Sequence, residues 1–199
     1  MFKKTVIAAA MVLGLSQGAQ ADMSAGMPNM GEANAQMQKS MALLPFLTAP
    51  IESSEVLSDD DVKRFIAAIK EKKSNYRDYS KKIEKGYEKA AEVVQKGANF
   101  NTFVKKAIEL SGVKSKLNRD ARDLGYNDAL DLTIKSARIG RAMVMAKMDE
   151  EIAKVPKEQQ EMMRSMTSGM VGQVKKEDIE VVKPYLGELE KIMKKKQQP

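Results

Sequence analysis

The chain contains no cysteine, no histidine and no tryptophan. Without thiols it forms no disulfide, so the burial of apolar side chains must hold the fold together. Without imidazole or thiolate ligands, the common zinc sites cannot form. Ser-His-Asp and Cys-His nucleophile systems are excluded for the same reason. An enzyme would have to use carboxylates, Lys, Tyr or a Ser-Lys pair. We therefore expect a non-enzymatic protein without a metal site or a cofactor.

Long apolar runs are also scarce. The clearest one, residues 5–15, is well short of the roughly 20 residues that span a bilayer. It follows Lys3 and Lys4 and precedes the small residues Ala19 and Ala21, which is the layout of a secretory signal peptide. We expect cleavage after Ala21 and a periplasmic protein that does not span the membrane. The net charge of +7 comes from interleaved basic and acidic residues, and nucleic acid is not an expected partner of an exported protein.

The segment that follows, residues 22–56, is rich in small and polar residues and is interrupted by Gly and Pro, which predicts a flexible segment. Part of it is apolar: Leu43, Leu44, Phe46 and Leu47. Such residues are too apolar for a free linker, so we expect them to dock on the domain. Residues 57–196 form that domain.

Apolar residues recur at helical spacing through the domain, and period-two alternation is missing. The sequence predicts an all-α fold, a single irregular bundle of about six to seven helices. The expected helices begin near Ser58, Tyr76, Phe100, Val113, Asn127, Pro156 and Pro184, and a short helical turn is expected from Asp178 to Lys183.

Two helix starts carry capping signals. Ser58 and Asp61 form an S-x-x-D capping pattern, which explains the acidic run around Asp61 better than a cation site does. Asn127 is the expected N-cap of the long fifth helix.

Methionines cluster in the second half of the domain. Met162, Met163, Met166 and Met170 lie on one expected helix, and Met143, Met145 and Met148 precede them. Flexible thioether side chains suit surfaces that accept varied partners, so we treat the first four as a candidate interaction surface. The alternative interpretation is that these methionines simply fill the core. We expect part of the sixth helix, which begins near Pro156, to be an exception to that interpretation.

Arg138 and Arg141 lie in the middle of the fifth helix. A buried arginine in a pocket can bind a carboxylate or a phosphate, so both are candidate anion contacts. A structural ion pair with Asp131 or Glu151 is the alternative.

The two ends of the chain offer further candidates. Methionines of the N-terminal segment (Met23, Met27, Met30, Met37 and Met41) could hold Cu(I), although no histidine accompanies them. Lys194, Lys195 and Lys196 form a basic tail that could lie on anionic lipid. The alternatives are an incidental methionine content and a solvated helix end.

Three stretches carry a resemblance: the capped start at residues 57–66, the turn at residues 124–126 and residues 182–189. There the chain resembles small exported helical proteins of proteobacteria over roughly residues 57–193. The resemblance implies an exported helical protein and transfers no activity and no site residue.

Together these observations favour a periplasmic binding protein, most concretely one that captures apolar segments as a chaperone does. An envelope lipid or small-anion binder and a Cu(I)-handling protein are the alternatives.

Overall fold

The computed structural model describes residues 41–70 and 80–197, apart from the side chains of residues 168, 170 and 194–197. Every regular element in these ranges is a helix, so the all-α prediction is confirmed. The expected signal peptide, residues 22–40 and the expected start of the second helix at Tyr76 lie outside the described residues.

The described part of the chain starts with helical residues 41–47 and continues in an irregular segment toward the first labelled helix. The elements are α3 (Asp59–Lys70), α4 (Ser80–Val93), α5 (Phe100–Leu110), α6 (Lys114–Asp123), α7 (Ala129–Ile152), α8 (Lys157–Val171), α9 (Lys176–Val182), η2 (Lys183–Tyr185) and α10 (Leu186–Gln197). None of the described helices is long and apolar enough to cross a bilayer.

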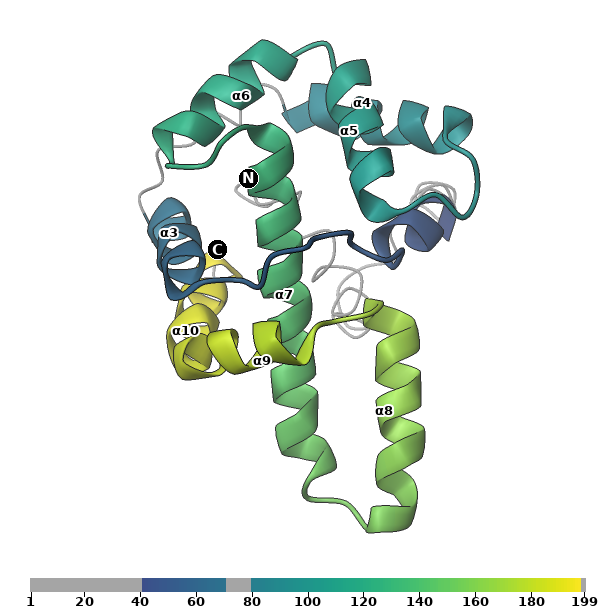
Figure 1. Cartoon of the computed structure of the whole chain (residues 1–199), viewed down its shortest axis with the longest axis vertical. Helices are drawn as coiled ribbons and strands as arrows, with labels where there is room; N and C mark the ends of the chain where they lie inside the picture. Colours follow the sequence, from purple (N-terminus) through teal and green to yellow (C-terminus); the bar gives the residue numbers. More distant parts are fainter. Residues whose placement is uncertain (1–40, 71–79, 198–199) are drawn as a thin grey trace, which may run out of the picture.

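Helix α7 is the axis of the molecule (Figure 1). One core joins residues 41–47 to α4, α5, α6 and the first half of α7. A second core joins α3, α9 and α10 to the middle of α7. Residues 136–143 are all buried, because the two cores and their connections surround this part of the helix. The remaining helix, α8, runs beside the second half of α7 as the other arm of a hairpin (Figure 1).

An irregular segment, residues 48–57, crosses α7 between the two cores, and we call it the strap (Figure 1). The helical turn before it docks as expected: Leu43, Phe46 and Leu47 are buried. Phe46 stacks on Phe103 of α5 with ring centroids 4.4 Å apart. Leu44 is 44% exposed, so the prediction that this residue docks on the domain is wrong. It follows Leu43 directly, and neighbouring residues of a helix point in different directions.

The capping pattern of α3 is confirmed. The Ser58 backbone N–H donates to Asp61 Oδ2 at 2.9 Å, and the Asp61 N–H donates to the Ser58 hydroxyl at 3.2 Å. Burial acts to raise the pKa of Asp61, but these hydrogen bonds and the ion pair with Lys135 outweigh it, so the pKa is lowered. The prediction that Asn127 caps α7 is wrong. Asp128, whose backbone is extended, caps α7 by accepting the Asp131 N–H, while the Asn127 N–H donates to the Asp131 carboxylate.

Helices α4 and α5 approach each other at Gly86. A Cβ at this position would overlap the Ala107 carbonyl oxygen and lie 3.0 Å from the Ser111 side chain.

We expect Gly86→Ala to destabilise the fold by about 1–3 kcal/mol, because the backbones must separate. Gly187→Ala is the matched control, since nothing lies within 4 Å of its Cβ. There alanine should stabilise the helix by roughly 0.5–1 kcal/mol. Urea unfolding measures both, and an equal response of the two variants would contradict the close approach.

Candidate functional site

The candidate interaction surface lies on α8, and the structure divides its methionines. Met162 is 62% exposed and Met166 is 64% exposed, while Met163 is half-buried. Met170 lies outside the described side chains. The first two are one helical turn apart, so they point in nearly the same direction.

The face of α8 that carries these methionines has almost no charge. With 3.6 residues per turn, Gln159, Met162, Ser165, Met166 and Gly169 fall on one side of the helix. All five are exposed. We call them the Met stripe; Glu158 is the charged residue at its start.

The other side of α8 packs on α7. Thr167 and Val171 are buried there. The Arg164 guanidinium is directed to α7 as well, since it forms an ion pair of 3.7 Å with Asp149. Apart from Glu158, the charged residues of α8 therefore flank or oppose the Met stripe. On α7 itself, Met143 is buried in the second core and Met145 packs against that core, so core filling explains these two methionines, while Met148 is half-buried.

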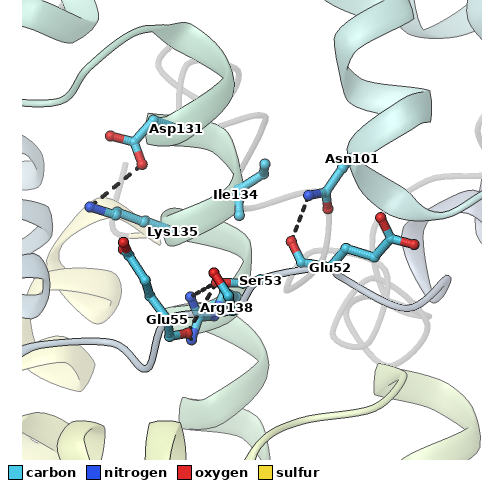
Figure 2. A pocket seen from close by; sticks show the side chains of 9 residues that line it. Glu52, Ser53, Glu55, Asn101, Asp131, Ile134, Lys135 and Arg138 are labelled. Atoms are coloured by element: carbon cyan, nitrogen blue, oxygen red, sulfur yellow. Dashed lines mark hydrogen bonds and ion pairs between the residues drawn. The ribbon is translucent and has the colours of Figure 1, made fainter.

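Arg138 is not a free anion contact (Figure 2). Its Nε and Nη2 donate to the two carboxylate oxygens of Asp178 at 2.8 and 2.7 Å. Its Nη1 donates to the Ser53 hydroxyl at 2.9 Å, and Nη2 also donates to the Glu55 carbonyl at 2.8 Å. Each guanidinium nitrogen thus has a protein acceptor. The partner is Asp178 of α9, not Asp131 or Glu151 as the sequence suggested.

Arg141 lies one turn further along α7 and is 1% exposed. Its Nη2 donates to the carbonyls of Leu47 and Ala49, at 2.5 and 2.9 Å. The guanidinium also lies over the Phe100 ring, 5.3 Å from the centroid. Its Nε and Nη1 are buried and have no acceptor in the described part of the chain. Burial lowers the pKa of Arg141 to about 10, so the group is still charged at neutral pH.

Further side chains hold the strap beside the two arginines. The Asn101 amide donates to the Glu52 carbonyl at 2.7 Å. Lys175 Nζ donates to the Ser53 carbonyl at 2.7 Å, and Asp178 Oδ1 accepts the Leu57 N–H at 2.9 Å. The strap has no regular secondary structure, so its backbone groups need these partners. The role of Arg138 and Arg141 here is to fix the strap on α7.

A surface pocket of about 450 Å³ opens between the strap, α5 and α7 (Figure 2). Its cations already have carboxylate partners: Arg138 pairs with Asp178, and Lys135 pairs with Asp61 at 2.9 Å and Asp131 at 3.5 Å. The pocket therefore offers no unpaired cation to an anion. Among residues 41–70 and 80–197, no group of three or more acidic side chains is placed to hold a metal ion.

The remaining candidates from the sequence stay predictions. Met23, Met27, Met30 and Met37 lie outside the described residues, and so do the side chains of Lys194, Lys195 and Lys196. Met41 is described and is 66% exposed.

The comparisons with known proteins found no counterpart for this chain. No protein-family model, no curated protein and no solved structure matches it. The resemblance to exported proteobacterial proteins therefore stays a prediction, and functional inference depends on the geometry described above.

The buried ion pair gives a direct prediction. We expect Asp178→Asn to lower the free energy of unfolding by about 3–5 kcal/mol, because it leaves the buried Arg138 without a counter-charge. Glu180→Gln on the same helix is the matched control, since Glu180 pairs with Lys183 at the exposed surface. It should change stability far less. Urea denaturation measures both variants. Equal effects would show that the Arg138–Asp178 pair does not hold the strap.

Proposed function

We propose that this protein is a non-enzymatic periplasmic binding protein that transiently captures apolar segments of unfolded clients on the Met stripe. The observation that supports this best is the pair of exposed methionines, Met162 and Met166, on a helix face that has no cation and one carboxylate, Glu158. Large exposed apolar side chains that gather on one face are typical of interaction sites.

The partner chemistry follows from the character of the stripe. Methionine side chains are flexible and polarizable, so they adapt to apolar groups of different shapes. A face without cations gives no reason to prefer an acidic ligand. The best occupant is therefore an apolar stretch of an unfolded chain, and a second copy of this protein or a lipid surface is an alternative outcome of the tests.

The size of the stripe predicts weak and reversible binding. Full burial of one methionine side chain contributes roughly 1.5–3 kcal/mol. Two such contributions are partly offset by the loss of translational and rotational freedom on association. Fast capture and release is the expected behaviour. The periplasmic location of this activity depends on the signal peptide expected at residues 1–21.

The capture hypothesis can be tested with insulin, whose B chain aggregates after reduction by dithiothreitol. The reductant leaves this protein unchanged, because it has no cysteine. We expect the wild-type chain to suppress light scattering, and the double variant Met162→Ser, Met166→Ser to lose most of that suppression. Its fold should persist, since both side chains are exposed.

Val93→Ser is the matched control, because Val93 on α4 is also 62% exposed but lies away from the Met stripe. It should protect insulin as well as the wild type does. Equal protection by all three proteins would remove the Met stripe as the capture surface. Concentration-dependent dimerisation that disappears in the double variant would instead assign the stripe to a second copy of the chain.

A further inference from the structure

The absence of cysteine makes methionine the side chain of this protein that peroxides oxidise most readily. Exposure decides which thioethers react first. Among the methionines whose side chains are described, Met41, Met162 and Met166 are 66%, 62% and 64% exposed. Met143 in the second core is 5% exposed. Met162 and Met166 thus combine high exposure with a place on the proposed capture surface.

We propose that Met162 and Met166 form a reversible oxidation site that switches capture off. This inference rests on the proposed function, because the switched activity is client binding at the Met stripe. The modification itself is independent of that function and can be measured without a client.

The chemistry is an oxygen transfer from a hydroperoxide. A sulfur lone pair attacks one peroxide oxygen, the S–O bond forms and the O–O bond breaks. The second oxygen leaves as water after a proton transfer when the oxidant is hydrogen peroxide. The sulfur is oxidised by two electrons and the peroxide is reduced. Sulfoxide reductases reverse the change by using two thiols, which become a disulfide, and they release the oxygen as water.

The effect of the modification follows from its position. A sulfoxide is polar, and it would replace each of the two large apolar groups of the Met stripe. The packing of α8 on α7 involves Thr167 and Val171 on the other side of the helix, so the fold does not depend on either thioether. Oxidation of Met143 would instead place a polar group inside the core that joins α7 to α3 and α9.

The first arm of the test maps the modification. The full chain is treated with hydrogen peroxide, and peptide mass spectrometry follows each methionine with time. We expect Met162 and Met166 to oxidise roughly ten-fold faster than Met143, with an unchanged circular dichroism spectrum. Equal rates for Met143 and the two α8 methionines would overturn the proposal.

The second arm measures capture of reduced insulin after the peroxide has been removed. Oxidised wild-type protein should lose capture by roughly ten-fold, the consequence of about 1.4 kcal/mol of lost apolar contact. Treatment with methionine sulfoxide reductases of both stereospecificities should restore it. The double variant Met162→Leu, Met166→Leu keeps the apolar surface and should capture with or without peroxide. Met162→Gln, Met166→Gln should bind weakly from the start.

Met41→Leu is the matched control. It removes the remaining highly exposed thioether among the described side chains, and the variant should stay as sensitive to peroxide as the wild type. Loss of capture by the oxidised leucine double variant would overturn the proposal, because the sensitive group would lie elsewhere. If the untreated wild type does not capture insulin, the proposed function fails. If the wild type captures insulin equally well after Met162 and Met166 have both been oxidised to sulfoxides, the proposed switch fails and the proposed function stands.

Discussion

Two buried arginines on α7 hold the strap that connects the two cores. The strap is irregular, so its carbonyl groups do not receive the hydrogen bonds that a helix would supply. Arg138 donates to the Glu55 carbonyl, and Arg141 donates to the carbonyls of Ala49 and of Leu47, the residue just before the strap. Asp178 neutralises Arg138 and also accepts a strap N–H. Arg141 has no carboxylate partner among the described residues, and it depends on carbonyl oxygens and the Phe100 ring. Because Phe46 and Leu47 dock just before the strap, these polar contacts also position an apolar anchor of the first core.

This arrangement explains which surface is free for binding. The middle of α7 is buried on all sides, and its arginines donate to groups of the chain itself. Among the described elements, helix α8 packs chiefly on α7, so these contacts use only one of its faces. The unused face is the Met stripe, and it has almost no charge in a chain in which 31% of the residues are charged. The proposed capture of apolar segments uses this surface, and the fold does not need it.

Local signals in the sequence predicted much of the fold. Helical spacing predicted the all-α class, the Ser58–Asp61 pair predicted the start of α3, and the apolar character of Phe46 predicted that it docks. The cap of α7 was misplaced by one residue, because Asn127 and Asp128 are both good capping residues and only the backbone conformation distinguishes them. Asp178 could not be identified as the partner of Arg138, since the two lie 40 positions apart and no local pattern links them. The sequence predicted that part of the sixth helix would be an exception to core filling, but it could not tell which of its methionines are exposed, because the packing of α8 on α7 decides between neighbours such as Met162 and Met163.

The most direct test of the account is a methyl NMR titration of the full chain. With ¹³C-labelled methionine methyl groups, each thioether reports on its own surroundings while reduced, unfolded insulin B chain is added. The account predicts that the signals of Met162 and Met166 shift or broaden and that the signal of Met143 stays in place. Unchanged signals of Met162 and Met166 while the client binds, or equal changes at all three methionines, would contradict it.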